Sequence, residues 1–180
     1  SDRDTEAEVE TIIRVFPDVL TRRGGIYLLY PIQCLAFILS DLQECMCNLK
    51  AVSFIPLVAM LAIEFGWFQE QDRGGLLCQD EVDDGNGFNG LQNLLRSDET
   101  TELHNQEHHE AVDDKYFQVL IQLRQMDLLK KEDIQSYNLL HSLYFRCHYF
   151  FTEMRFRFLV EWDPNALTQT DEFRNVPLQD

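Results

Sequence analysis

The sequence lacks the short motifs that mark two common classes of enzyme. It contains no Walker loop and no G-x-S-x-G pattern. A Walker loop holds nucleotide phosphates on backbone N–H groups, and G-x-S-x-G places a nucleophilic serine on a sharp turn. The sequence therefore does not support either chemistry, and we expect no bound cofactor.

Long hydrophobic runs are also missing. The two apolar runs, Ile26–Leu39 and Ala51–Ile63, fall short of the roughly 20 residues that a membrane-spanning helix needs. The N-terminal residues 1–4 are acidic and form no apolar signal core. We therefore expect no membrane association and no secretion.

Basic residues are scarce. The chain of 180 residues has 15 Lys and Arg against 31 Asp and Glu, which gives a net charge of −16. Such a charge repels phosphate backbones and anionic lipids. We expect no nucleic-acid partner, whereas a protein partner with a basic surface is compatible with this charge.

Cysteine pairs with the spacing of metal ligands are absent. The five cysteines are an odd number and include no C-x-x-C: Cys34, Cys45, Cys47, Cys78 and Cys147. Neither a disulfide framework nor a zinc ribbon is indicated. Reduced thiols are typical of an intracellular protein, so we expect a cytoplasmic or nuclear location.

The chain does contain the periodicity of short helices, and 45% of its residues are hydrophobic, enough for a core. In residues 1–68, a helix is predicted after Pro31, with apolar residues at i, i+3, i+4 and i+7: Ile32, Leu35, Ala36 and Leu39. A second helix is predicted for Pro56–Phe65, and Gly66 is placed to stop it.

Three more helices are predicted in residues 113–180. The first has Asp113 or Asp114 as its cap and ends near Lys130 and Lys131. The second is indicated by an apolar stripe over residues 140–147. Thr152 caps the third, which Pro164 terminates. Alternation typical of strands is nowhere sustained, so the predicted fold class is all-α.

A strongly acidic segment separates these two helical blocks. Between Gln79 and Asp114 lie eleven Asp or Glu residues and one basic residue, Arg96. Such a segment is typical of a solvated loop. We therefore expect one domain over residues 1–180, with an acidic loop insertion at residues 69–112 between blocks 1–68 and 113–180.

Two segments far apart in the chain resemble each other. Phe16–Thr21 (FPDVLT) matches Asp163–Thr168 (DPNALT). A few residues further on, Tyr30–Gln33 (YPIQ) matches Val176–Gln179 (VPLQ), and Asn138–His141 (NLLH) is a third, weaker copy. Self-similarity of this kind indicates a repeat protein.

These tetrads resemble degenerate versions of the T-P-L-H that opens the first helix of an ankyrin repeat. In that family the threonine caps the helix, the proline preorganises its first turn, the leucine enters the core and the histidine bonds neighbouring loops. Family repeats often carry an aspartate before the leucine. Asp171 precedes Leu178 and Asp133 precedes Leu140 by the same interval.

The chain is similar to the divergent ankyrin-repeat-like families of microalgae over residues 131–180 and, more loosely, over 10–66. No copy has the full T-P-L-H, and Arg174 stands where the family has a turn glycine. The tetrads that begin at 138 and 176 are 38 residues apart, against a family period of about 33.

This resemblance implies a fold of ankyrin-like helix pairs in a short, irregular solenoid that is an excerpt of a longer array. It also implies a non-catalytic protein–protein interaction module. In the family, turn tips and first helices line the binding face. The positions implied here are Gln135, Tyr137, Glu172 and Arg174.

Two other functions stay open. His104, Glu107 and His108 match H-x-x-E-H, the inverted zinc-protease signature. On a helix the two histidines would lie one turn apart and bind one zinc, with Glu107 as general base. Because the segment is polar, we expect a solvated cluster without metal, and a zinc-dependent hydrolase is the alternative. A purely structural role in a longer solenoid is the other alternative.

Overall fold

The computed structural model of the chain describes residues 5–24, 28–39, 45–79, 87–97, 106–144, 150–170 and 175–177. The described part is mostly helical, as the sequence predicts. It contains long helices of ten residues or more and short helices of four to six residues. The only sheet within these ranges is a hairpin of two three-residue strands.

The described α-helices fall into two length classes. The long helices are α1 (Glu6–Val15), α3 (Ile55–Glu64), α5 (Gln106–Gln125) and α8 (Glu153–Trp162). The short helices are α2 (Pro31–Ala36), α4 (Gly90–Asn93), α6 (Lys131–Ser136) and α7 (Leu139–Tyr144). The 3-10 helices are η1 (Pro17–Thr21), η2 (Val52–Phe54), η3 (Glu70–Asp72) and η4 (Pro164–Thr168).

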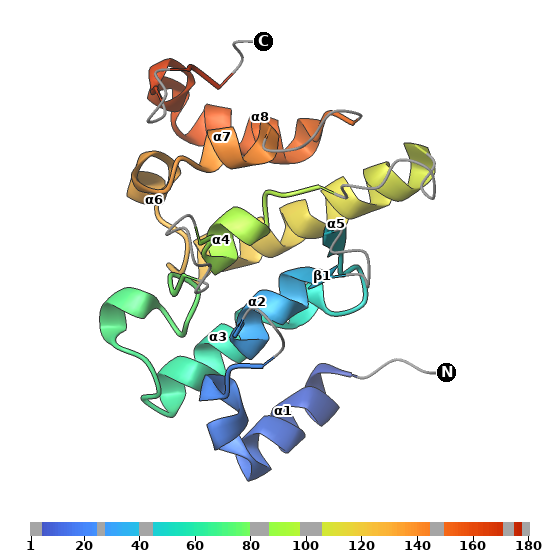
Figure 1. Cartoon of the computed structure of the whole chain (residues 1–180), viewed down its shortest axis with the longest axis vertical. Coiled ribbons are helices and arrows are strands. Elements are labelled where there is room, and N and C mark those ends of the chain that lie inside the picture. Colours follow the sequence, from blue (N-terminus) through green and yellow to red (C-terminus); the bar gives the residue numbers. More distant parts are fainter. Residues whose placement is uncertain are drawn as a thin grey trace.

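The helices form two stacks that run along the long axis of the molecule (Figure 1). In the first stack α1 contacts α3, α3 contacts α5 and α5 contacts α8. In the second, α2 contacts α4 and α4 contacts α7. Across the stacks α2 contacts α3 and α7 contacts α8, and we call each such level of the stacks a tier. The apolar core lies between the stacks, with Ile55, Leu91, Leu120 and Leu140 almost fully buried.

The first predicted helix is shorter than its apolar stripe. It ends at Ala36, and strand β1 (Phe37–Leu39) pairs with β2 (Cys45–Cys47) in an antiparallel hairpin. The Ala36 carbonyl accepts hydrogen bonds from the Tyr116 hydroxyl and the Asn48 N–H instead of continuing the helix. The prediction that the helix extends to Leu39 is therefore wrong, because partners distant in sequence take its last carbonyl.

The predicted helix over Pro56–Phe65 is confirmed within one residue at each end by α3, which covers Ile55–Glu64. Gly66 follows it with a φ of 67°, and the N–H groups of Gly66 and Trp67 bond the carbonyls of Ile63 and Ala62. These bonds satisfy carbonyls that the helix end leaves open.

The helix predicted from Asp113 begins earlier and ends earlier. It starts at Gln106 and stops at Gln125. Asp127 has a φ of 57°, and the N–H of Leu128 bonds the Leu123 carbonyl at 2.8 Å, which closes the helix end. Lys130 and Lys131 therefore begin α6 rather than end α5, a correction to the predicted boundary.

The segment predicted as a solvated acidic insertion, residues 69–112, contributes to the core where the structure describes it. Leu76, Leu91, Leu94 and Leu95 are fully buried, and α4 lies between α2 and α7 in the short-helix stack. The acidic composition of the segment predicted a solvated loop. The leucines are buried because they pack between tiers, and composition does not indicate such packing.

The two similar segments found in the sequence have the same local structure. Phe16–Thr21 and Asp163–Thr168 each contain a proline that starts a 3-10 helix directly after a ten-residue helix. In both, the threonine hydroxyl donates to the carbonyl three residues earlier, at 3.1 Å for Thr21 and 2.9 Å for Thr168. The sequence similarity thus reflects one repeated way of leaving a long helix.

A ladder of polar side chains connects successive tiers at the start of each short helix. Gln33 of α2 donates to the carbonyls of Cys78 and Phe88 at 3.2 and 3.3 Å. One tier on, Gln92 of α4 donates to the Tyr137 carbonyl at 3.1 Å. In the next tier, His141 of α7 lies 3.0 Å from the Asn175 carbonyl.

These three side chains occupy the fourth position of equivalent tetrads. Two of the tetrads were recognised in the sequence, and the third is Asn89–Gln92 (NGLQ), which was missed. The Gln33 and Gln92 amide oxygens also cap their own helices by accepting the N–H of Tyr30 and Asn89, at 2.8 and 2.9 Å. The ladder therefore combines local capping with bonding between tiers.

Replacing Gln92 with glutamate separates these two roles. A carboxylate can still accept the Asn89 N–H, but it cannot donate to the Tyr137 carbonyl. We expect the free energy of unfolding to fall by about 1 to 3 kcal/mol, because the half-buried carboxylate then faces an unpaired carbonyl. Urea unfolding measures this, and Gln118→Glu on the exposed face of α5 is the control. Equal stability of the two variants would contradict the ladder.

Candidate partner-binding groove

A groove of about 580 Å³ runs between one face of α5 and residues 48–54, which lead into and include η2 and are called the η2 segment. The η2 segment contributes Leu49, Lys50 and Ser53. The helix contributes Ala111, Asp114, Lys115, Gln118, Val119 and Gln122, which recur at helical spacing. The groove combines an apolar floor with amide, hydroxyl and charged groups, a mixture typical of binding sites.

Two residues of α5 hold the η2 segment against the helix. The Lys115 ammonium donates to the Leu49 carbonyl at 2.6 Å. The Tyr116 hydroxyl accepts the Asn48 N–H at 2.8 Å and donates to the Ala36 carbonyl. Burial raises the pKa of Tyr116 well above its usual value, so the phenol keeps the proton that it donates. These bonds fix the position of the η2 segment, which forms one side of the groove.

The two lysines in the groove differ from most other cations in the described part of the chain. Outside the groove, seven cations lie beside carboxylates: Arg14 with Glu10 and Glu64, Arg22 with Asp18, Arg73 with Asp133, Lys130 with Asp127, Lys131 with Asp163, Arg155 with Asp113, and Arg157 with Glu153. Arg124 instead lies over the rings of Phe158 and Trp162. Among the described residues, neither Lys50 nor Lys115 has a carboxylate within ion-pair distance.

The residues that the ankyrin resemblance selected for partner binding lie elsewhere. Gln135 is exposed on α6, but its side chain bonds the buried Asp163 carboxylate and its carbonyl accepts from Gln169 at 2.6 Å. Tyr137 is half-buried against the core. Glu172 and Arg174 lie outside the described residues. The structure brings Gln135 and Tyr137 together at the tier boundary, where both take part in contacts within the fold.

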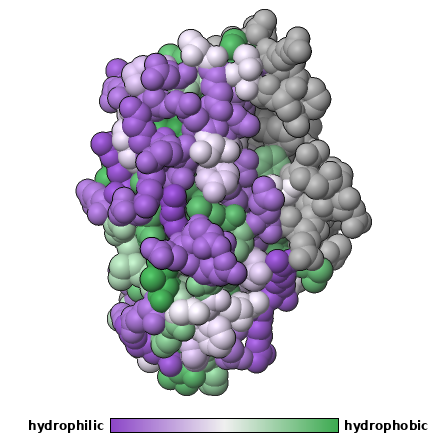
Figure 2. All heavy atoms as spheres, turned by 90° about the vertical axis from the view of Figure 1, so that its left-hand side faces the viewer, coloured by the Kyte–Doolittle hydropathy of each residue, from purple (hydrophilic) through white to green (hydrophobic). Residues whose placement is uncertain are grey.

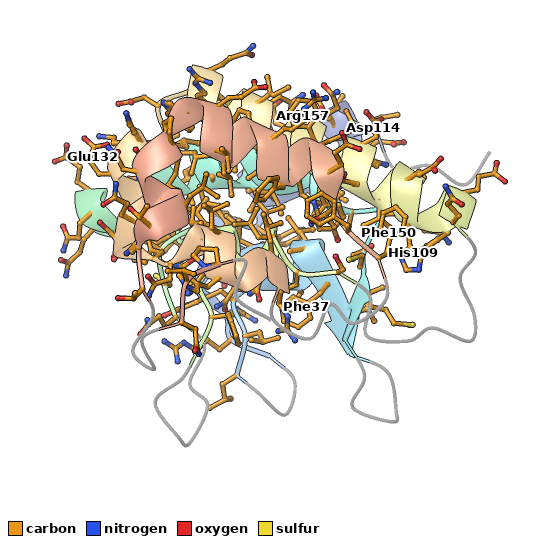
Figure 3. The ribbon with its side chains drawn as sticks, turned by 90° about the horizontal axis from the view of Figure 1, so that it is seen from above. Phe37, His109, Asp114, Glu132, Phe150 and Arg157 are labelled. Atoms are coloured by element: carbon orange, nitrogen blue, oxygen red, sulfur yellow. The ribbon has the colours of Figure 1, made fainter. Side chains whose placement is uncertain are left out.

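The H-x-x-E-H cluster is only partly described. His104 lies outside the described residues, whereas Glu107 is exposed and His108 half-buried in the first turn of α5. The next residue, His109, is 9% exposed and stacks on Phe150 with ring centroids 4.9 Å apart, as Figure 3 shows. Within the described ranges no three His, Cys, Asp or Glu side chains gather as metal ligands.

Residues 85–90 have the spacing G-x-G-x-x-G, which in dinucleotide-binding proteins follows a strand and opens a long helix. Here the final glycine, Gly90, opens the four-residue α4, and the described segment 66–79 before it contains no strand. A Cβ atom at Gly90 would lie 3.0 Å from the Leu76 carbonyl oxygen. We therefore explain Gly90 by close packing against Leu76.

Of the three cysteines whose side chains are described, Cys34 and Cys78 are free thiols, and the Cys47 thiol donates to the Arg96 carbonyl at 3.7 Å. Burial raises the pKa of Cys34, and burial with the nearby Asp72 raises the pKa of Cys78 to about 11. Both thiols are therefore protonated at neutral pH and poor nucleophiles.

A second exposed feature lies at the α1 end of the stacks. There α1 and η1 expose large apolar side chains: Ile12, Val15, Phe16 and Val19. Figure 2 shows hydrophobic atoms at the corresponding lower end of one face. Exposed apolar side chains that gather in this way are typical of surfaces that bind protein.

Sequence reasoning missed the groove because its residues come from two segments more than fifty positions apart. The sequence around Lys50 and Ser53 contains no binding motif. Gln118 and Gln122 fit the polar face of an ordinary helix. Asp114 was taken as a helix cap, but it lies in the third turn of α5 and lines the groove, at an edge of the molecule in Figure 3.

Comparison with known proteins returned no match to a family model, to a curated protein or to a solved structure. Within the described residues, no helix has both the length and the apolar character needed to cross a membrane.

Proposed function

We propose that this chain is a non-catalytic protein–protein interaction module built from divergent ankyrin-like helix pairs. The observation that carries the proposal is the ladder of Gln33, Gln92 and His141, in which the fourth residue of each tetrad bonds the next tier. The resemblance to T-P-L-H implies this role for the fourth position. Stacked helix pairs of this kind serve mainly to present a continuous surface for recognition.

The groove between η2 and α5 supports the binding role. It is open, and within the described residues the side chains of Gln118, Gln122 and Lys50 on its lining make no hydrogen bond or ion pair with the rest of the fold. Glutamine amides can bond the backbone of a bound chain as donors and acceptors, and the half-buried Leu49 supplies apolar contact. We therefore place the partner on this face of α5 rather than at Gln135 and Tyr137.

A photo-crosslinking experiment tests this function. The chain carries benzoylphenylalanine in place of Gln118 and is irradiated in an extract of the cells that produce it. We expect a protein to crosslink, and an excess of unlabelled chain to suppress the product. The matched control carries the same group at Gln125, which is exposed on α5 but outside the groove.

The proposed function fails if Gln118 yields no competable product, or if Gln125 yields the same product in the same amount. Repeating the experiment with Ala111→Arg tests whether the groove itself carries the binding, because a long side chain at this exposed groove position should obstruct the groove and abolish the Gln118 product.

A second candidate is a structural segment of a longer array. It is favoured by the apolar side chains that α1 and η1 expose, since a further helical tier would bury Val15 and Phe16. The complete reading frame of the gene is the test: helical tiers encoded next to α1 would support this role, and an unrelated flanking sequence would oppose it.

A further inference from the structure

The groove carries local positive charge in a chain of net charge −16. Lys50 is exposed and Lys115 is half-buried, and neither has a carboxylate partner within the described residues. Lys115 uses one of its three N–H donors on the Leu49 carbonyl, so two remain. Seven of the other described cations lie beside carboxylates, so two lysines without such a partner on one groove give it a local positive charge.

Resting on the proposed function, we propose that this groove binds an acidic peptide segment of the partner protein. A glutamate or aspartate side chain is held by the ammonium groups of Lys50 and Lys115. An apolar neighbour contacts Leu49. The amides of Gln118 and Gln122 bond the peptide backbone.

The net negative charge of the chain does not prevent a short acidic segment from binding in the groove. At physiological ionic strength, charges further apart than about 8 Å are largely screened, so the lysines in contact with the ligand dominate its recognition. A nucleic acid is different, because its phosphates continue beyond the groove and meet acidic surface. Asp114, the one acid among the groove residues, limits the number of carboxylates that bind. The expected ligand is therefore a short acidic peptide rather than an extended polyanion.

Fluorescence anisotropy with a labelled peptide of sequence GLEELEELG tests the inference. Its matched control, GLQQLQQLG, has the same length and apolar residues but no charge. We expect the acidic peptide to bind at least about tenfold more tightly than the neutral one, a difference of about 1.4 kcal/mol. A basic version, GLKKLKKLG, measures attraction to the net negative charge alone.

A pair of variants locates the binding. Lys50→Glu reverses one charge in the groove, and Lys130→Glu makes the same change to the net charge at an exposed lysine outside it. We expect Lys50→Glu to weaken the acidic peptide by about tenfold or more and Lys130→Glu to leave it nearly unchanged. Nitrogen–proton correlation spectra of the folded chain should show peptide-induced shifts at residues 49–53 and 111–122.

The inference is overturned if the neutral peptide binds as tightly as the acidic one, if neither binds, or if both variants weaken binding equally. Binding of the basic peptide alone would point to a basic partner instead. These outcomes are separate from the test of function: competable crosslinks from Gln118 without acidic-peptide binding would leave the module a protein binder of different specificity.

Discussion

Replacing Gly74 with alanine is expected to lower the free energy of unfolding by about 4 kcal/mol or more, an effect large enough to unfold many proteins. Gly74 follows η3 with a φ of 66°, and a Cβ atom there would lie 2.2 Å from the carbonyl oxygen of Ala59. That oxygen belongs to the backbone of α3, and Ala59 is fully buried. The clash cannot be relieved by rotating a side chain.

Gly66→Ala is the matched control for this change. Gly66 has almost the same φ, 67°, but a Cβ atom there would meet nothing within 4 Å. We expect it to cost only the left-handed backbone penalty, about 1 to 2 kcal/mol. Urea unfolding of both variants, followed by circular dichroism, separates backbone strain from steric overlap. If the two variants are equally stable, Gly74 does not pack against α3 as described.

Truncating Asp113 to alanine is expected to destabilise the protein by about 3 to 5 kcal/mol. The Asp113 carboxylate accepts the Nε–H of the fully buried Arg155 at 2.8 Å and the Met154 N–H, at the start of α8, at 2.8 Å. Its removal leaves a buried guanidinium without a countercharge and the first turn of α8 without a cap. Thermal or urea unfolding measures the loss.

The neighbouring residue is the control. Asp114→Ala changes the same residue type on the same helix, but Asp114 is exposed, so we expect a change within about 0.5 kcal/mol. The double change Asp113→Leu with Arg155→Met should cost less than Asp113→Ala alone, because it removes both buried charges together. A double variant that is less stable than the single one would mean that the ion pair itself is strongly favourable.

The position of α8 shows how far local patterns predict the fold. Thr152 and Pro164 predicted its ends, and the helix covers Glu153–Trp162 as expected. The cap has a different acceptor, however: the Thr152 side chain makes no capping bond, and Asp113 from α5 accepts the Met154 N–H instead. The sequence indicates where a helix ends but not which distant side chain satisfies its N–H groups.

The repeated segments show the same difference between what the local sequence indicates and what contacts between distant residues determine. Proline and threonine in Phe16–Thr21 and Asp163–Thr168 act within a few residues, so their similarity could be seen in the sequence. The tetrad Asn89–Gln92 was missed because glycine replaces the proline and the spacing between tetrads is irregular. Only the bond from Gln92 to the Tyr137 carbonyl makes it equivalent to Gln33.

Helical character, the ends of α3 and α8 and the shared turn after α1 and α8 follow from the sequence, because capping residues, prolines and apolar periodicity act over a single turn of chain. The candidate groove, the buried Arg155–Asp113 pair and the burial of the leucines around α4 were decided by the tertiary structure. Each depends on the distance between side chains from different tiers, and that distance is set only when the helices pack against one another.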